Sequence, residues 1–326
     1  MRRAAAMRCA CTVAAVALAS CGGPRQSAPL TVGVPSLEQN ALLYVAAAKG
    51  MFVPQALAVT IEDFATGPAA IAALQSGTVD IAETAEFPFV ASTMSGARMR
   101  VLTANDKFEN DYLVARRDRG ISRIADLRGK RIGVTRNAIT QFYLGRFLLL
   151  NGIRPQEVTL VDVPPSDFVA SFAQGRVDAV VAWQPFVSRM TSAAPAAATV
   201  WPVQSGQAVY GILVSGQEWL QSHADVVKRF LTALAGAEDY VARRPADAQA
   251  VVAQRLSYDT PYLAAVWPNH GFSLTLDASL VEAMEDEGRW LIANHLSTAT
   301  QIPDFDALVY RNGLTAARPE GVNLVQ

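Results

Sequence analysis

The stretch Gln75-Ser76-Gly77-Thr78-Val79-Asp80-Ile81-Ala82 decides the fold, because a second version of it follows later in the chain. That version is Gln174-Gly175-Arg176-Val177-Asp178-Ala179-Val180-Val181. Both stretches have the pattern of a helix end, a glycine that closes the helix, and Val-Asp leading into an apolar strand. A glycine cap beside an aspartate is common local chemistry, so the flanking segments must show whether the two stretches mark two similar lobes.

Strand-like and helix-like runs alternate around both stretches. Around the first, the expected strands are 30–34, 58–64, 77–82 and 98–104, and the expected helices are 41–49, 66–74 and 87–94. Around the second, the expected strands are 126–134, 158–163 and 175–182, and the expected helices are 141–151 and 166–174. This alternation predicts an α/β protein with two similarly built lobes, each a mainly parallel sheet flanked by helices. After residue 215 the pattern predicts helices at 224–243, 247–256 and 279–295, packed around a finished sheet.

Composition and charge exclude several classes of protein. Of the 326 residues, 51% are hydrophobic, which is ample material for a large core. Lys plus Arg number 28 and Asp plus Glu number 29, which gives a net charge of −1. Proteins that bind nucleic acids usually carry a basic surplus, so no nucleic-acid partner is expected.

Candidate catalytic and metal-binding residues are scarce. All three cysteines lie at or before Cys21, so the body of the chain has no disulfide framework, thiolate metal site or cysteine nucleophile. His223, His270 and His295 are too far apart for a metal-binding pair on one helix turn, and we interpret them as satisfied or solvated side chains. The sequence also lacks the motifs of serine hydrolases, phosphate-binding loops, dinucleotide-binding folds and zinc peptidases. We therefore predict no catalytic residue, cofactor or metal.

The first 29 residues predict export and attachment to a membrane. Residues 1–20 are expected to be a signal peptide, because arginines precede an apolar run of about eleven residues, far shorter than the roughly 20 that span a bilayer. The run ends in Leu18-Ala19-Ser20-Cys21, which resembles a bacterial lipobox, and Cys21 is expected to carry the lipid. An ordinary signal peptide with a chance cysteine is the alternative. Residues 21–29, rich in Gly, Pro and Ser, are expected to be a flexible tether.

Five segments carry a resemblance to a known family. They are Ala47-Ala48-Lys49-Gly50-Met51-Phe52, the stretch 72–82, Ala85-Glu86-Phe87-Pro88-Phe89-Val90, the stretch 127–134 and the stretch 177–185. Together they resemble the periplasmic substrate-binding proteins of ABC importers. More narrowly, the chain is similar to the nitrate/sulfonate/taurine group, which includes the thiamine-pyrimidine (NMT1/THI5-like) binders. The resemblance covers roughly residues 30–240.

The resemblance implies a two-lobed periplasmic binding protein fold of type II, with a two-strand hinge and a ligand held between the lobes. We expect residues 1–20 to be the signal peptide, 30–112 and 213–326 to form lobe 1, and 113–212 to form lobe 2. It also implies a small-molecule ligand, an ABC permease with its ATPase as partners, a monomeric state and a periplasmic location.

The ligand is expected at the carboxyl ends of the strands, where helix N-termini offer free N–H groups to an anion. Two loops fit, Ala65-Thr66-Gly67-Pro68 and Thr135-Arg136-Asn137-Ala138. Thr66 and Thr135 could instead be plain helix caps, and Trp183 could simply fill the core. The candidate ligand-binding residues are Gln39, Thr66, Gly67, Glu86, Phe87, Asp111, Thr135, Arg136, Asn137, Ala138, Trp183, Gln184 and Tyr210.

Glu86 is expected to discriminate between ligands, because a carboxylate in a closing cleft repels a bare anion. If Glu86 faces the cleft, the ligand carries an amine, as taurine does. If Glu86 points away or pairs with Arg136, a simple sulfonate is allowed, and a role at the helix start is the third option. Gln184 and Asn137 depart from the family pattern, which often has an acid and a glycine there.

The favoured function is capture of a small anionic or zwitterionic solute, sulfonate-like or taurine-like, for delivery to the permease. Binders of a thiamine-precursor pyrimidine or of nitrate are alternatives within the same class. A ligand-sensing lipoprotein is an alternative of another class. The family's pyrimidine-synthesis enzymes use a histidine and cysteines near the cleft, whereas this chain has no cysteine after Cys21 and no histidine before His223.

Overall fold

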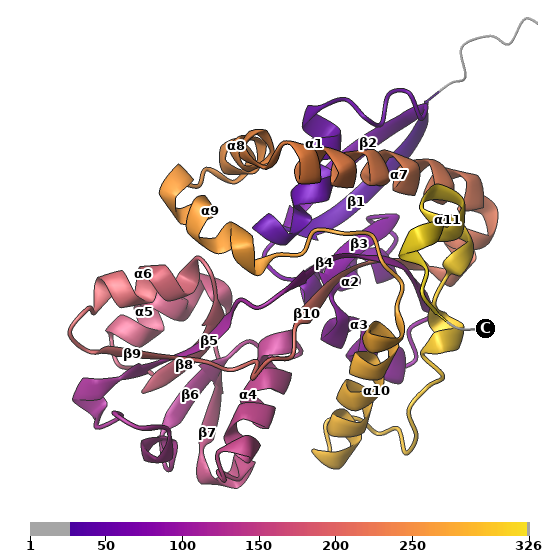
Figure 1. Ribbon diagram of the computed structural model, residues 1–326. Coiled ribbons are helices and arrows are strands. Elements are labelled where there is room, and N and C mark those ends of the chain that lie inside the picture. Colours follow the sequence, from indigo (N-terminus) through magenta and orange to yellow (C-terminus); the bar gives the residue numbers. More distant parts are fainter. Residues whose placement is uncertain (1–26, 325–326) are drawn as a thin grey trace, which may run out of the picture.

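The structure is a computed structural model that describes residues 27–324 (Figure 1). The chain forms two lobes, each built on a five-stranded sheet. The expected signal peptide and the expected lipid acceptor Cys21 lie outside the described residues, as does most of the expected tether. Within residues 27–324, no helix is long and apolar enough to cross a membrane.

The first sheet has the strand order β2-β1-β3-β10-β4. Its strands are β1 (Ala28–Pro35), β2 (Leu57–Phe64), β3 (Ile81–Ala85), β4 (Met99–Phe108) and β10 (Val209–Gly216). β1 pairs in parallel with β2 and β3, whereas β10 runs antiparallel to β3 and β4. The sheet is therefore mixed, because β10 enters it from the other lobe and runs against its neighbours.

The second sheet repeats this plan with the order β7-β6-β8-β5-β9. Its strands are β5 (Asp111–Arg116), β6 (Arg131–Val134), β7 (Thr159–Asp162), β8 (Ala179–Trp183) and β9 (Ala198–Pro202). β6 is parallel to β7 and β8, and β5 is antiparallel to β8 and β9. The prediction of two similarly built α/β lobes is confirmed, with the same strand order in both.

The aspartate of the repeated Val-Asp motif accepts the same kind of backbone hydrogen bond in each lobe. Asp80 Oδ2 accepts a hydrogen bond from the backbone N–H of Thr31, inside β1, at 2.8 Å. Asp178 Oδ2 accepts one from the backbone N–H of Arg131 at 2.9 Å, where β6 begins. The glycines before them, Gly77 and Gly175, have φ values of 74° and 67°, which residues other than glycine rarely adopt. The motif therefore ties the segment before β3 to β1, and the segment before β8 to β6.

Helices cover both sheets. The first lobe contains α1 (Ala41–Ala48), α2 (Gly67–Gln75) and α3 (Glu86–Met94), and the second contains α4 (Ile139–Leu150), α5 (Phe168–Ala173) and α6 (Phe186–Ala193). The last third of the chain adds α7 (Gln217–Arg243), α8 (Pro245–Leu256), α9 (Thr260–Val266), α10 (Ala278–Ala293) and α11 (Arg311–Ala317). Figure 1 shows these five helices gathered around the first sheet, which confirms the prediction that they pack around it.

The chain crosses between the lobes twice, from β4 to β5 through residues 109–110 and from β9 to β10 through residues 203–208. The buried side chain of Gln204 ties the two crossings together. Its Oε1 accepts hydrogen bonds from the backbone N–H groups of Asn110 at 2.6 Å and Asp111 at 2.8 Å. Its Nε2 donates to the backbone oxygens of Phe108 and Gln207, both at 3.1 Å. One amide thus satisfies four backbone groups of the hinge.

The sheets place the crossings close to the expected boundaries. β5 begins at Asp111 in the second sheet, and β10 begins at Val209 in the first. The expected boundaries, after residue 112 and before residue 213, differ from these strand starts by a few residues and stay a proposal for how the chain divides into moving bodies.

A second contact joins the lobes away from the hinge. Trp290 of α10 packs edge-on against Phe142 of α4 and against Phe87 of α3, with ring centroids 5.5 and 5.8 Å apart. A Cβ atom on Gly145 of α4 would collide with the Trp290 ring. The helices can therefore approach this closely only because residue 145 is a glycine.

We expect Gln204→Leu to lower the free energy of unfolding by about 3 kcal/mol, because it leaves buried backbone donors at Asn110 and Asp111 without an acceptor. Urea denaturation measures the effect. The matched control is Gln207→Leu, since the Gln207 side chain makes no hydrogen bond within residues 27–324. Equal stability of the two variants would show that Gln204 does not hold the crossings together.

Candidate functional site

A cavity of about 50 Å³ lies between the lobes, where the carboxyl ends of β1, β2, β3 and β8 converge. This is the position at which open α/β sheets bind ligands. The hinge segment between β4 and β5 forms part of its wall, so the cavity lies between the bodies that the hinge connects. The cavity is lined by Pro35, Leu37, Gln39, Thr66, Gly67, Pro68, Ala85, Pro88, Phe108, Asn110, Asp111, Ala138, Ile139 and Trp183.

Six candidate residues from the sequence line this cavity. They are Gln39, Thr66, Gly67, Asp111, Ala138 and Trp183. They come from five separate loops or strand ends, and both lobes contribute. Contact of each with a ligand stays a prediction.

Asp111 and Trp183 form a cross-strand pair at the second-lobe wall. The two residues are directly opposite each other in the antiparallel β5–β8 ladder, so their side chains point to the same face. Within the described residues, no hydrogen bond reaches Asp111 Oδ2 or Trp183 Nε1, although both atoms are buried. Burial raises the pKa of the Asp111 carboxyl to about 7. Buried polar groups normally have partners, so this pair has binding capacity to offer a ligand.

The first-lobe wall is the start of α2. Thr66 caps the helix, its Oγ1 accepting a hydrogen bond from the backbone N–H of Ala69 at 3.3 Å. Gly67 is packed so tightly that a Cβ atom there would overlap Thr84 Oγ1. Because Gly67 lies in the first turn of the helix, its N–H has no intrahelical acceptor and is suited to an anion.

Three further candidates, two at the start of α3 and one in β10, lie outside this cavity. Glu86 is fully buried, and its Oε2 accepts a hydrogen bond from the backbone N–H of Tyr210 at 3.1 Å. Phe87 packs between Phe142 and Trp290 in the contact between the lobes. The Tyr210 hydroxyl lies 2.7 Å from Ser279 Oγ. Glu86 therefore does not face the cleft, because α3 turns its side chain toward β10 and α10.

The remaining four candidates are also outside the cavity, each for a local reason. Thr135 Oγ1 donates to the backbone oxygen of Val163 at 3.0 Å. Arg136 is exposed and lies 4.0 Å from Asp162, so it does not pair with Glu86.

Asn137 has a φ of 59° and borders a separate, larger groove along α2 and α3. Gln184 Oε1 accepts hydrogen bonds from the backbone N–H and Oγ of Ser188 at 3.1 and 2.8 Å. Of the second predicted loop, only its last residue therefore reaches the cavity.

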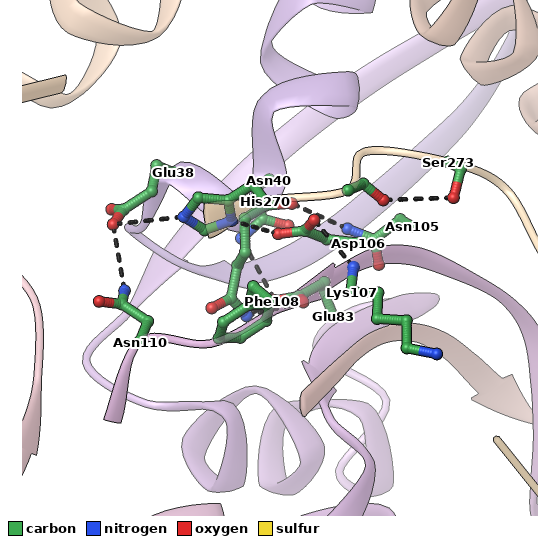
Figure 2. Close-up of polar contacts among 12 residues, drawn as sticks. Glu38, Asn40, Glu83, Asn105, Asp106, Lys107, Phe108, Asn110, His270 and Ser273 are labelled. Atoms are coloured by element: carbon green, nitrogen blue, oxygen red, sulfur yellow. Dashed lines mark hydrogen bonds and ion pairs between the residues drawn. The ribbon is translucent and has the colours of Figure 1, made fainter. Parts of the chain in front are cut away.

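A buried charged cluster behind the cavity was missed by the sequence analysis (Figure 2). His270 Nδ1 lies 2.5 Å from Asp106 Oδ2, and its Nε2 lies 3.8 Å from Glu38 Oε1. Burial alone would lower the pKa of His270, but Asp106 and Glu38 raise it to about 9, so the imidazole is cationic at neutral pH. His270 is thus a core histidine that lies beside the candidate site. The interpretation of it as a satisfied side chain holds for Nδ1 only, because the buried Nε2 makes no hydrogen bond within residues 27–324.

Glu83 forms the other half of this buried polar layer. Gln39 Nε2 donates to both of its carboxyl oxygens, at 2.8 and 3.1 Å, and Asn40 Nδ2 donates at 3.2 Å. Burial raises the pKa of Glu83 to about 8 despite these hydrogen bonds. An acid inside an otherwise apolar strand was a signal in the sequence, because a buried charge requires partners.

Two further buried carboxyl groups, on α3 and α10, have oxygens without a hydrogen-bond partner. Glu86 Oε1 and both oxygens of Glu287 on α10 make no hydrogen bond within residues 27–324. Burial raises the pKa of both groups. The Glu86 charge raises the pKa of Glu287 further, and the Asp111 charge raises that of Glu86. No group of three or more His, Cys, Asp or Glu side chains among the described residues is arranged to hold a metal ion.

Comparisons with known proteins identify the class. The chain has the fold of the periplasmic binding proteins, with two mixed sheets and a cavity between them. The sequence model of the NMT1/THI5-like family matches residues 38–248, so the chain belongs to the NMT1/THI5-like family. This confirms the family to which the sequence pointed.

Relatives among characterised or named proteins are distant. A protein of Brucella abortus named only as a putative binding protein is 25% identical over 265 residues, which cover 79% of this chain and 80% of the relative. The taurine-binding periplasmic protein of Escherichia coli is 28% identical over 182 residues, which cover 55% of this chain and 56% of the relative.

Solved structures confirm the fold. The alkanesulfonate-binding protein SsuA from Xanthomonas axonopodis pv. citri, bound to MOPS, superimposes with a TM-score of 0.75 at 20% identity, covering 88% of this chain and 99% of that one. The desulfurization enzyme DSZB has the same fold, with a TM-score of 0.66 at 17% identity, covering 91% of this chain and 100% of that one. The fold alone therefore does not separate a binding protein from an enzyme.

The buried groups predict that stability falls as pH rises. The pKa values of Asp111 (about 7), Glu83 (about 8) and His270 (about 9) all lie above their usual values of 3.8, 4.5 and 6.5. The folded chain therefore binds protons more tightly than the unfolded chain, and the free energy of unfolding decreases between about pH 4 and pH 9.

Calorimetry at pH 5.5 and pH 8.5 should show the melting temperature lower by several degrees at the higher pH. Glu83→Gln, which cannot ionise, should make this difference smaller. A melting temperature that is unchanged or higher at pH 8.5 would contradict the proton balance described here.

Proposed function

We propose that this protein is an exported solute-binding protein that closes its two lobes over a small organic zwitterion with an anionic head and an amine, such as an aminosulfonate. The observation that carries the proposal is the composition of the cavity wall. The second lobe offers the unpartnered Asp111 carboxylate and Trp183 N–H, and the first lobe offers the N-terminus of α2.

Each end of such a solute has a counterpart in the cavity. An ammonium group would donate to Asp111, and binding would favour the ionised form of this buried acid. An anionic head would accept from the Gly67 N–H and from Trp183 Nε1. A hydrogen bond to a charged group contributes about 1.5–3 kcal/mol, so three to five of them reach the roughly 8 kcal/mol of micromolar binding.

Asp111 now takes the discriminating role that the sequence analysis gave to Glu86. A bare anion such as nitrate or an alkanesulfonate would face this carboxylate without neutralising it, which costs binding free energy. The names of two relatives, taurine-binding and alkanesulfonate-binding, agree with a solute of this size and charge. Delivery to an ABC permease, rather than sensing, is proposed from the same relatives.

The cavity volume indicates that ligand entry needs lobe opening. About 50 Å³ is a third of the roughly 150 Å³ of a cavity that admits benzene. We therefore propose that the lobes separate at the two crossings, admit the solute and close again, as in other hinged binding proteins.

The first test is a thermal-shift screen with taurine, ethanesulfonate, nitrate and an aminopyrimidine, followed by calorimetric titration. Taurine should raise the melting temperature most, and ethanesulfonate, which lacks the amine, should bind more weakly. A screen in which only the aminopyrimidine or only nitrate binds would replace the proposed ligand class. Turnover of a bound compound would contradict a binding role.

Asp111→Asn should weaken taurine binding by about 10- to 100-fold, because it removes one charged hydrogen bond. It should strengthen ethanesulfonate binding, because the carboxylate that opposes a bare anion is gone. Asp162→Asn, at an exposed carboxylate outside the cavity, is the matched control. If Glu86→Gln rather than Asp111→Asn abolishes the preference for taurine, the sequence-based role of Glu86 is right and that of Asp111 is wrong.

We also propose that the mature protein is exported and anchored by lipid on Cys21. The full-length chain expressed in a bacterium should then sediment with membranes and gain the mass of a diacylglyceryl group. Cys21→Ser should move it to the soluble fraction, whereas Cys9→Ser and Cys11→Ser should not. A Cys21→Ser protein that stays with the membranes would contradict the anchor.

A further inference from the structure

His270 lies directly behind the cavity wall without lining it. The residue forms an isolated antiparallel bridge with Phe108, which does line the cavity. Its ring stacks between Phe108 and Phe272, with centroid distances of 5.3 and 5.1 Å. The His270 side chain is only 1% exposed, so its position is fully determined by neighbouring groups.

The imidazole connects two segments that supply cavity residues. One is the end of β4, through Asp106, and the other is the short 3₁₀ helix Glu38–Asn40 after β1, through Glu38. Glu38 Oε1 also accepts hydrogen bonds from Asn110 Nδ2 and the Tyr262 hydroxyl, both at 3.3 Å. Figure 2 shows Glu38 between His270 and Asn110.

Asn110 in turn makes hydrogen bonds to the second crossing and to the second lobe. Its backbone N–H donates to Gln204, and its Oδ1 accepts from the backbone N–H of Gln184 at 3.4 Å. Gln39, the neighbour of Glu38, lines the cavity and is itself held by Glu83. The His270 ring therefore contacts the cavity residue Phe108 directly, and through Glu38 it is connected to the cavity residues Gln39 and Asn110.

The neighbouring acidic groups favour the charged form of the ring. The groups that face it are the Asp106 carboxylate from β4, the Glu38 carboxylate, and the Tyr262 hydroxyl of α9 beside Glu38. Glu83 of β3 adds a further carboxyl near Asp106. With a neutral imidazole, Asp106 and Glu38 would lose the cationic partner that they have among the described residues, which is unfavourable.

We propose that His270 is a positioning residue of the cleft, which as an imidazolium holds Glu38 and Asp106 so that Gln39, Phe108 and Asn110 keep their places at the cavity. The role in binding rests on the proposed function, whereas the positioning of Asn110 does not. The two are therefore tested by separate measurements.

The ligand-free test is an NMR pH titration of the isotopically labelled protein. One histidine should titrate near pH 9, and the side-chain amide resonances of Asn110 should shift with the same midpoint. Asp106→Asn should lower both midpoints together, and His270→Gln should remove the shift of Asn110. His295→Gln, at an exposed histidine, should change neither. Asn110 resonances that do not follow the imidazole would overturn the proposal.

The binding test compares dissociation constants for whichever solute the screen identifies. At pH 7.5, His270→Gln should weaken binding about tenfold, and at pH 10 its affinity should approach that of the wild type, whose imidazole is then neutral too. The ratio of the two constants cancels titration of the ligand's own amine. A ratio that stays the same at both pH values would overturn the role in binding. Failure of every solute would defeat the proposed function, and the NMR titration would still decide the positioning.

Discussion

The structure depends on one constraint at the hinge. Residues 27–324 cross between the lobes twice, and the side chain of Gln204 makes hydrogen bonds to both crossings. The Gln204 side chain satisfies backbone groups from both crossings, so they move as a unit. Everything at the cavity is arranged around these hydrogen bonds. Asn110 and Asp111 take part in them, and Trp183 is placed by its register opposite Asp111. A ligand that binds Asp111 on one side and α2 on the other would therefore bridge two bodies joined at a narrow hinge.

The region around this hinge contains an unusual number of buried ionisable groups. The pKa values of Glu83, Glu86 and Asp111 shift upward because desolvation opposes isolated carboxylates, and the pKa of His270 shifts upward because it lies beside Asp106 and Glu38. Most of these groups make hydrogen bonds or ion pairs with other residues of the protein. Asp111 differs, since it lines the cavity and its buried Oδ2 has no hydrogen-bond partner within residues 27–324, and we propose it as the acid that a solute can use.

Local patterns in the sequence predicted the fold well. The Val-Asp stretches, the glycine caps and the alternation of strands and helices depend on neighbours in the chain, and the two sheets follow that order. Gly67, Asp111 and Trp183 could be placed for the same reason, since they lie at strand or helix ends. The side chain of Glu86 could not, because α10, which begins far along the chain at Ala278, determines where it packs. The place of His270 beside the site could not be predicted from the sequence, because the residue reaches β4 through a pairing between distant segments.

Small-angle X-ray scattering with and without a saturating solute tests the central claim most directly, because closure of two lobes changes the shape of the whole molecule. The ligand-free protein should have a larger radius of gyration, and with the solute present the curve should agree with the arrangement of the lobes drawn in Figure 1. Superimposable curves, with a solute bound at full occupancy, would contradict it.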